Sequence, residues 1–200
     1  MRKPIIVFAV LCAVLGGGAA FGQSDLDRQL YQAAKSGQQK TVESLLKQGA
    51  GIDALVCENR QRCGTPLTAA AQSGAAEVVS LLLKKGANVE ARDNYKQTAL
   101  ILAAGKGCTE CVRLLLGKRA SIQAKNNFGS TAFLAAAAGG HTPLVRLLLE
   151  KGARVDETDS LNQTALHEAA EGNPAETVEL LLSKGARVAA RSASRDPPLT

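Results

Sequence analysis

Apolar residues gather along the chain in two kinds of short block, separated by polar or glycine-containing stretches. The first kind is built around two adjacent alanines, at Ala70-Ala71, Ala103-Ala104, Ala136-Ala137 and Ala169-Ala170. The second kind holds three adjacent leucines, at residues 81–83, 114–116, 147–149 and 180–182. Blocks of this length, with charged residues at their ends, are typical of short helices that bury one face. The pattern therefore predicts pairs of short helices.

Residues that start and stop helices stand at the ends of these blocks. Thr65 comes where a helix begins, and its hydroxyl can accept a hydrogen bond from a free N–H of the first turn. Pro66 follows at the first helical position, where its missing N–H costs nothing. Gly74 permits a tight turn into a second helix, which carries residues 78–83 into the core. Gly86 ends that helix, and an extended turn follows it.

The same signals return at regular intervals of about 33 residues. They include Thr65-Pro66-Leu67, Thr98-Ala99-Leu100, Thr131-Ala132-Phe133 and Thr164-Ala165-Leu166. A strict period of this length predicts a stacked solenoid. The pattern resembles the ankyrin repeat, and His167 supplies the histidine of that motif. The resemblance implies an all-α ankyrin-repeat solenoid of about five helix-turn-helix units, joined by short β-hairpin fingers.

The resemblance covers residues 25–191. We expect five units, at about 25–54, 55–92, 93–125, 126–158 and 159–191. The first is degenerate, with Leu30, Ala33-Ala34 and Leu45-Leu46 in place of the usual blocks. Both end units carry many polar residues, as terminal repeats must when one side meets water. Residues 192–200 hold Pro197-Pro198 and no apolar pattern, so we expect a disordered tail.

The segment 1–22 has the layout of a secretory signal peptide. Arg2 and Lys3 precede an apolar run over residues 5–15, and small residues follow it. The run is too short for a membrane-spanning helix, which needs about 20 residues. We expect cleavage before Gln23, with a cut before Phe21 as the second possible site, and a periplasmic or secreted protein without stable membrane insertion. An uncleaved anchor is the alternative. Removal of Arg2 and Lys3 lowers the net charge from +6 to +4.

Composition and spacing exclude several functions. Aromatic residues make up only 3% of the chain, which argues against an RNA-recognition sheet, and no basic cluster of nucleic-acid type is present. His141 and His167 lie in different units and fit structural roles in the repeat. No catalytic set or metal-ligand spacing is visible. We therefore expect a protein with no enzymatic activity, no cofactor, no metal and no nucleic-acid partner.

Four cysteines follow the signal peptide, an even number that suggests disulfides in an exported protein. Cys57 and Cys63 flank a stretch that is four residues longer than its equivalents, and a bridge there would staple the first finger. Cys108 and Cys111 form a Cys-x-x-Cys motif at the start of a helix, a position that suits redox exchange. Structural thiols or a structural disulfide are the leading interpretation of this motif. A thiol–disulfide redox protein is the alternative function.

Family resemblance implies that the fingers and first helices line a concave face that binds a protein partner. Along that face the chain places basic, then apolar, then acidic residues. The candidates for partner binding are Arg60, Arg62, Tyr95, Lys96, Leu102, Phe128, Leu161 and Glu168. Tyr95, Phe128 and Leu161 are one repeat interval apart, and the alternative is that they pack finger against finger. We expect a monomer whose partner the sequence does not identify.

Overall fold

The helices and strands follow one another in a regular order in the computed structural model, which describes residues 25–59, 62–172 and 175–188. The helices are α1 (Asp25–Lys35), α2 (Gln39–Lys47), α3 (Pro66–Ser73), α4 (Ala76–Lys84), α5 (Ala99–Lys106), α6 (Thr109–Gly117), α7 (Ala132–Ala138), α8 (Thr142–Glu150), α9 (Ala165–Gly172) and α10 (Ala175–Ser183). The strands are β1 (Val56–Asn59) and β2 (Arg62–Gly64). The expected signal peptide and the expected tail lie outside the described residues.

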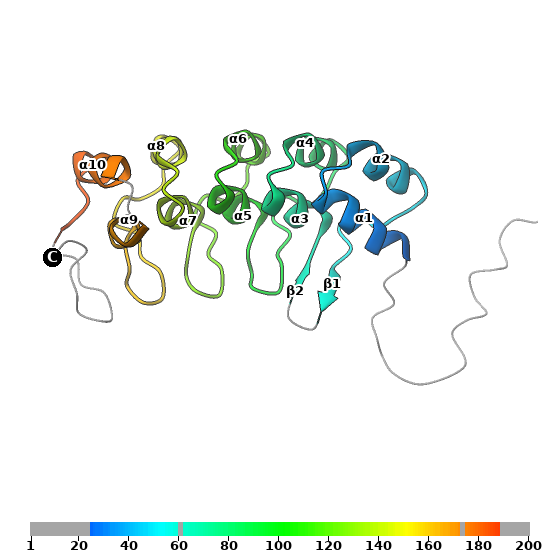
Figure 1. The fold of residues 1–200 in the computed structure, drawn as a ribbon, viewed down its shortest axis with the longest axis horizontal. Coiled ribbons are helices and arrows are strands. Elements are labelled where there is room, and N and C mark those ends of the chain that lie inside the picture. The colour runs from blue at the N-terminus through cyan, green and yellow to red at the C-terminus, as the bar shows by residue number, and fades with distance from the viewer. Residues whose placement is uncertain (1–24, 60–61, 173–174, 189–200) are drawn as a thin grey trace, which may run out of the picture.

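The helices form two parallel rows, as Figure 1 shows. The odd-numbered helices make an inner row, in which each contacts the next, and the even-numbered helices make an outer row. The connections between successive helix pairs project from the inner row as loops. This is the all-α solenoid that the repeat predicts.

Threonine caps begin the inner helices, as the sequence predicts. The hydroxyls of Thr65, Thr98 and Thr131 accept hydrogen bonds from the backbone N–H groups of Thr68, Ile101 and Leu134. Thr68 donates its own hydroxyl to the Thr65 carbonyl and accepts from the Thr65 N–H, so α3 has a reciprocal capping box. The inner helices therefore start at equivalent places in successive units.

Small side chains let the inner helices approach one another closely. Ala70, Ala103 and Ala136 have no exposed surface, and each lies between neighbouring helices of the inner row. Leucines from the outer row, such as Leu82, Leu115 and Leu148, fill the space between the two rows. Phe133 is one of the few large rings in this core and is also fully buried. The core is thin and continuous, which is why the chain carries so few aromatic residues.

Within the described parts of the chain, four loops project from the inner row, and we call them fingers: residues 54–65, 91–98, 124–131 and 157–164. In the described parts of these loops, only the first has paired strands, in which β1 and β2 are antiparallel with Cys57 opposite Cys63. The second and fourth have a single bridge each, Arg92 with Thr98 and Thr158 with Thr164. The first finger is four residues longer than its equivalents, and this length allows the β1–β2 pairing. No helix within the described parts of the chain is both long and apolar enough to cross a membrane.

Candidate partner-binding surface

One side chain shapes the tip of each of the last three fingers. Asp93, Asn126 and Asp159 recur once per repeat, and each uses its Oδ1 atom to accept two backbone N–H groups across the turn. Asp93 binds the N–H groups of Tyr95 and Gln97 at 2.8 Å each. Asn126 and Asp159 repeat these bonds at 2.8–3.0 Å. The three tips therefore share one turn, which a side chain stabilises in each.

A left-handed residue follows the tip side chain in each of these fingers. Lys96, Gly129 and Asn162 have φ values of 57°, 74° and 58°. Glycine and asparagine adopt this region readily, whereas lysine does so at a cost in free energy. The sequence marks Lys96 as a departure from the turn preference, and the structure shows that it nevertheless takes the same conformation.

Neighbouring fingers are joined by backbone hydrogen bonds. The N–H of Asn94 donates to the Cys63 carbonyl at 3.1 Å, and that of Asn127 donates to the Tyr95 carbonyl at 2.9 Å. Ser160 continues the series, because its N–H and its hydroxyl both donate to the Phe128 carbonyl. The fingers therefore form one continuous edge.

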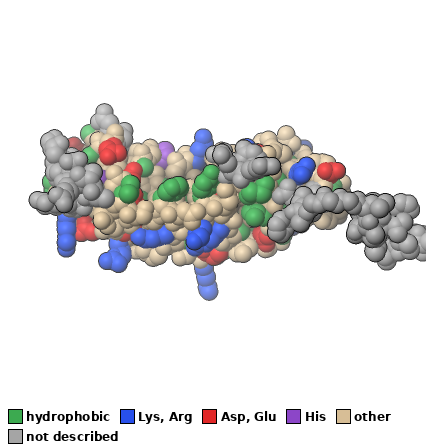
Figure 2. Space-filling model, turned by 90° about the horizontal axis from the view of Figure 1, so that it is seen from below, with side chains coloured by type: hydrophobic (Ala, Val, Ile, Leu, Met, Phe, Trp, Pro, Cys, Tyr) green, Lys and Arg blue, Asp and Glu red, His purple; other side chains and the backbone are tan. Residues whose placement is uncertain are grey.

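The three equivalent tip residues differ in exposure. Phe128 is 59% exposed and Leu161 is 55% exposed, which is unusual for large apolar side chains. Tyr95 is half-buried and lines a small hollow with Tyr31 and Cys63. Figure 2 views the molecule from the side of the fingers and shows hydrophobic side chains following one another along its long axis. Tyr95 thus lies beside a residue of the first finger in the lining of this hollow, whereas Phe128 and Leu161 are mostly exposed to solvent.

A shallow depression lies between the fingers and the inner row. It has a volume of about 310 Å³, and its apolar walls include Leu102 and Ala135. Polar groups surround these walls, among them Gln72, Gln97 and Lys106. Leu102 is half-buried, so an apolar side chain from outside could still contact it.

The surface becomes acidic toward α9. Glu168 is half-buried, and burial raises the pKa of its carboxyl above the usual value; the nearby charges of Asp159 and Glu171 raise it further. Glu157 has a different role in the same region. It is buried, its Oε1 accepts a hydrogen bond from the Thr131 hydroxyl, and burial raises its pKa despite that bond and the charges of Lys125 and Arg154.

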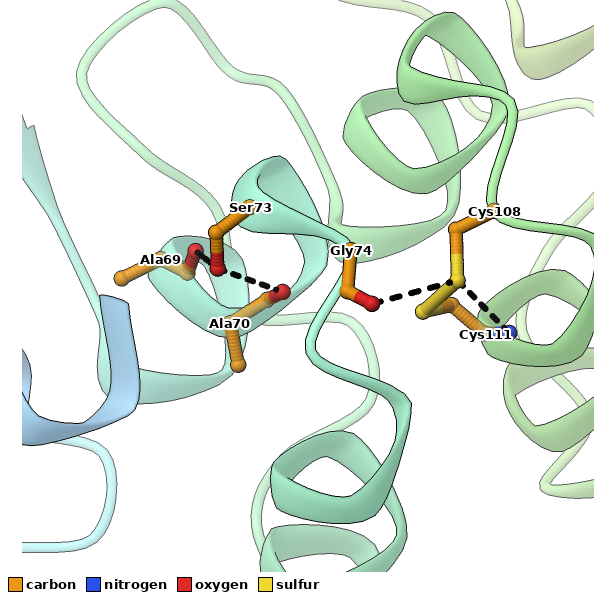
Figure 3. Close-up of a disulfide and its surroundings, with 6 residues drawn as sticks. All are labelled: Ala69, Ala70, Ser73, Gly74, Cys108 and Cys111. Carbon is orange, nitrogen blue, oxygen red and sulfur yellow. Dashed lines mark hydrogen bonds between the residues drawn. A yellow bond between two sulfur atoms is a disulfide. The ribbon is translucent and has the colours of Figure 1, made fainter. Parts of the chain in front are cut away.

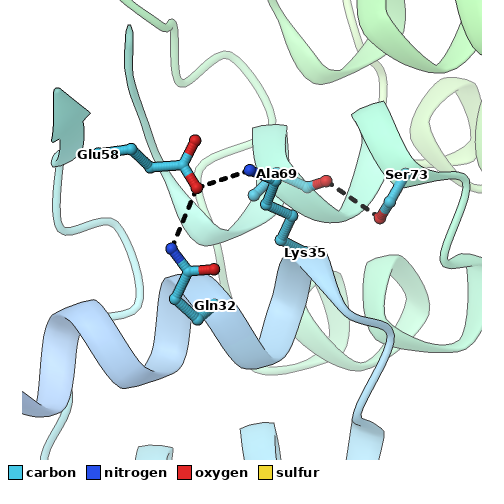
Figure 4. Close-up of polar contacts among 5 residues, drawn as sticks. All are labelled: Gln32, Lys35, Glu58, Ala69 and Ser73. Carbon is cyan, nitrogen blue, oxygen red and sulfur yellow. Dashed lines mark hydrogen bonds and ion pairs between the residues drawn. The ribbon is translucent and has the colours of Figure 1, made fainter.

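An ion pair anchors the first finger to α1. Glu58 Oε1 accepts from Lys35 Nζ at 2.6 Å and from Gln32 Nε2 at 3.0 Å (Figure 4). The Cys57–Cys63 disulfide closes the same finger, and Asn94 Oδ1 binds the Cys63 N–H. Of the predicted basic residues, Arg62 lies on β2 and Arg60 lies outside the described residues. Lys96 is exposed at the tip of the second finger.

Sequence reasoning missed Glu58 and the three tip-forming residues. A signal for the latter was present, because Asp93, Asn126 and Asp159 recur at the repeat interval. Nothing in the repeat marks Glu58, since it lies in the extra residues of the first finger.

Comparison with known families decides the assignment. A family model described as "Ankyrin repeats (3 copies)" matches residues 30–126 and 118–192, which together cover most of the chain. The chain belongs to the ankyrin-repeat family. Ankyrin repeats generally mediate protein–protein interaction and are typically non-enzymatic. No curated protein matches the chain significantly.

The two histidines make hydrogen bonds, His167 within its own ankyrin unit and His141 to the preceding unit. His167 Nδ1 accepts the Thr164 N–H at 3.1 Å and lies 2.8 Å from the Thr164 hydroxyl, so this pair begins α9. His141 Nε2 lies 3.1 Å from the Gly105 carbonyl and can donate to it. Within the described ranges no three His, Cys, Asp or Glu side chains are grouped so that they could hold a metal ion.

The second cysteine pair lies at the opposite end of the helices from the fingers. Cys108 precedes α6 and Cys111 lies in its first turn; their sulfur atoms are bonded in the structure (Figure 3). The two pairs are thus separate, each closed within its own unit. The described site residues accordingly lie in two places. The partner-binding candidates and the Cys57–Cys63 pair lie on the fingers and inner helices, and the second cysteine pair lies at the start of α6.

Proposed function

We propose that this ankyrin-repeat protein binds a partner protein in the periplasm through a surface made of its fingers and inner helices. The observation that carries the proposal is the exposure of Phe128 and Leu161 on finger tips whose backbones are fixed by hydrogen bonds. A large apolar side chain on a rigid backbone loses little conformational freedom on binding, so it favours association.

The charges near this surface favour a partner segment that carries a basic side chain beside an apolar one. Lys106 borders the depression beside Leu102, and the carboxyls of Glu168, Glu171 and Asp159 lie together near α9. A segment with an apolar side chain for the depression and a Lys or Arg beyond it would relieve the repulsion among these carboxyls. Tyr95 then serves mainly to support the second finger, and Lys96 extends the surface toward the N-terminal end. Arg60 and Arg62 stay candidates on the sequence alone.

Photo-crosslinking in the native host tests the binding surface. A photoreactive amino acid is placed at position 128, at position 161 or at position 182, where Leu182 is an exposed apolar residue of the outer row. We expect positions 128 and 161 to give the same discrete adduct and position 182 not to give it. Identical adducts from all three positions, or none from the fingers, would exclude this surface.

The second part of the test measures the affinity of this chain for the partner protein that the crosslinking identifies, after that partner has been purified. Phe128→Ala combined with Leu161→Ala should weaken binding about thirtyfold or more, which corresponds to the loss of roughly 2 kcal/mol expected for interface anchors. Leu182→Ala is the matched control and should leave the affinity unchanged. Unchanged affinity in the double variant would show that Phe128 and Leu161 do not contribute to binding.

The cellular location is tested by expressing the full chain and sequencing the N-terminus of the product. The proposal expects a periplasmic or secreted protein that begins at Gln23 and spans the five units over residues 25–191. A product that retains Met1 and stays with the membrane would favour the uncleaved anchor. Sedimentation of the purified product should give the mass of a monomer.

A further inference from the structure

The two cysteine pairs of this chain lie in different surroundings, and the difference concerns their sulfur atoms. Cys57 and Cys63 face each other across an antiparallel hairpin. Within the described residues, no backbone N–H donates to either of their sulfur atoms. Cys108 and Cys111 instead occupy the N-cap and the first turn of α6. This second pair therefore experiences a helix terminus that the first pair does not.

The sulfur of Cys108 receives a hydrogen bond from the helix. The backbone N–H of Cys111 points to Cys108 Sγ at a distance of 3.2 Å. An N–H at a helix N-terminus stabilises negative charge, and a thiolate gains more from it than a disulfide sulfur does. The contact therefore favours the reduced state of the pair, in which Cys108 can carry that charge.

A second contact also becomes stronger on reduction. Cys108 Sγ lies 3.6 Å from the carbonyl oxygen of Gly74, the residue that ends α3 in the preceding unit (Figure 3). A disulfide sulfur has no proton to donate, whereas the thiol of Cys108 can donate to this oxygen. Each protonation state of the reduced Cys108 thus has a partner in place, the Gly74 carbonyl for the thiol and the Cys111 N–H for the thiolate.

Exposure distinguishes the two sulfurs of this pair. Cys111 is fully buried in the core, whereas Cys108 is half-buried at the turn between α5 and α6. A thiol from another molecule can therefore approach Cys108 and not Cys111. A half-buried cysteine at a helix N-terminus and a fully buried one three residues later have separate roles in exchange.

We propose that Cys108–Cys111 is an exchangeable, redox-active disulfide that oxidises a dithiol partner, and that Cys57–Cys63 is a structural bridge. A thiolate of the partner attacks Cys108 Sγ, forms a mixed disulfide and breaks the bond to Cys111. The electron pair leaves on the Cys111 sulfur, which takes up a proton. This activity is independent of partner binding by the finger surface.

The partner's second thiolate completes the reaction. It attacks the partner sulfur of the mixed disulfide and forms a disulfide within the partner. Cys108 leaves as a thiolate. Two electrons have then passed from the partner dithiol to the cysteine pair. Of the two protons of the dithiol, one is on the Cys111 sulfur and the other has gone to solvent, from which the Cys108 thiolate can take it up; no other reactant is required.

Redox equilibration of the wild-type chain gives the first test, and it needs no variant. The protein is held at a series of ratios of reduced to oxidised glutathione, free thiols are alkylated, and mass spectrometry measures the reduced fraction of each pair. We expect Cys108–Cys111 to be half-reduced at a glutathione ratio at least about tenfold less reducing than the ratio that Cys57–Cys63 requires. A tenfold difference corresponds to about 1.4 kcal/mol of thiolate stabilisation. Equal ratios, or a reversed order, would overturn the proposal.

Single-cysteine variants test the role of each sulfur. Cys111→Ser leaves Cys108 as a free thiol, and Cys108→Ser leaves Cys111. The first variant should react at least about tenfold faster with oxidised glutathione, because Cys108 is less buried than Cys111 and has the N–H donor. Equal reaction rates in two variants with wild-type circular dichroism would contradict the assigned roles. Wild-type protein should also oxidise one equivalent of a reduced dithiol peptide, and a Cys108→Ser, Cys111→Ser variant with an intact Cys57–Cys63 bridge should not. Oxidation of the peptide by that variant would assign the activity to the other pair.

Discussion

The first finger and the three later fingers occupy equivalent places in the solenoid and are stabilised by different means. The later fingers use one side chain each, Asp93, Asn126 or Asp159, to bind two backbone N–H groups. The first finger uses the Cys57–Cys63 disulfide and the ion pair of Glu58 with Lys35. Its tip is charged in sequence, whereas the later tips carry Tyr95, Phe128 and Leu161.

The position of the first finger explains the difference. Each later finger donates a backbone N–H to the carbonyl of the finger before it, at Cys63, Tyr95 and Phe128 in turn. Among the described residues no finger precedes the first one, and its bonds run to α1 through Glu58 instead. The disulfide and the ion pair thus stabilise the first finger in place of bonds to a preceding finger. The later fingers are each bonded to the one before and carry no such disulfide in the described residues.

Gly129→Ala should have the largest effect on stability, a loss of about 3 kcal/mol. A Cβ atom at this position would lie 2.6 Å from the Ser160 nitrogen and 3.0 Å from the Asp159 carbonyl carbon, so the fourth finger must shift. The left-handed φ adds roughly 1 kcal/mol. Denaturant unfolding measures the change.

Lys96→Gly is the matched control for this substitution. Lys96 adopts the same backbone conformation in the second finger, and replacing it by glycine should raise stability by about 0.5–1 kcal/mol. A similar loss in both variants would mean that close approach between fingers is not what sets the residue at this position.

Replacing Cys57 and Cys63 together by serine should lower stability by about 2 kcal/mol, the value expected for a short closed loop. Glu58→Gln removes the charge of the anchor and keeps an acceptor for Gln32, so it should cost less, under about 1 kcal/mol. Thermal unfolding under non-reducing conditions compares the three proteins. A larger loss from Glu58→Gln would make the ion pair, and not the bridge, the main restraint of the first finger.

The repeat, the helix starts and the small core were predictable from the sequence. They depend on local rules, such as Thr65 capping α3 and paired alanines at helix contacts, that recur four times and reinforce one another. Equivalence of Tyr95, Phe128 and Leu161 was also readable, because it follows from the repeat interval alone.

Exposure at these three positions was not predictable in the same way. The exposure of each side chain depends on the residues of the neighbouring finger and helices. Tyr95, for example, lines the same small hollow as Tyr31. The anchor of the first finger joins Glu58 to Lys35 across a long stretch of chain, a contact that no local pattern announces. The sulfur contacts of Cys108 with Gly74 likewise required the stacking of two units.

Asp93→Ala should lower stability by about 1.5 kcal/mol, because two N–H groups of the second finger tip lose a charged acceptor. Asp93→Asn is the matched control, since Asn126 makes the same two bonds in the third finger. The asparagine variant should stay within about 0.5 kcal/mol of wild type in denaturant unfolding, as expected for a substitution that keeps both bonds. Equal losses in both variants would show that charge, and not the pair of bonds, holds these tips.

Glu168→Gln should have the smallest effect, and its sign depends on pH. Burial and the charges of Asp159 and Glu171 raise the pKa of Glu168, so the folded state binds this proton more tightly than the unfolded state does. The resulting stabilisation is complete below the unfolded pKa of about 4.5 and is lost as pH rises through the higher folded value. Melting temperatures should therefore be equal at pH 4 and slightly higher for the glutamine variant at pH 7.

Glu171→Gln removes one of the two like charges and leaves the burial of Glu168, so it should give a smaller gain at pH 7. A glutamine variant at position 168 that is less stable than wild type at pH 7 would contradict the predicted repulsion. The same substitution connects stability to recognition. If a cationic side chain of the partner neutralises these carboxyls, Glu168→Gln should weaken partner binding at the same pH at which it stabilises the free protein.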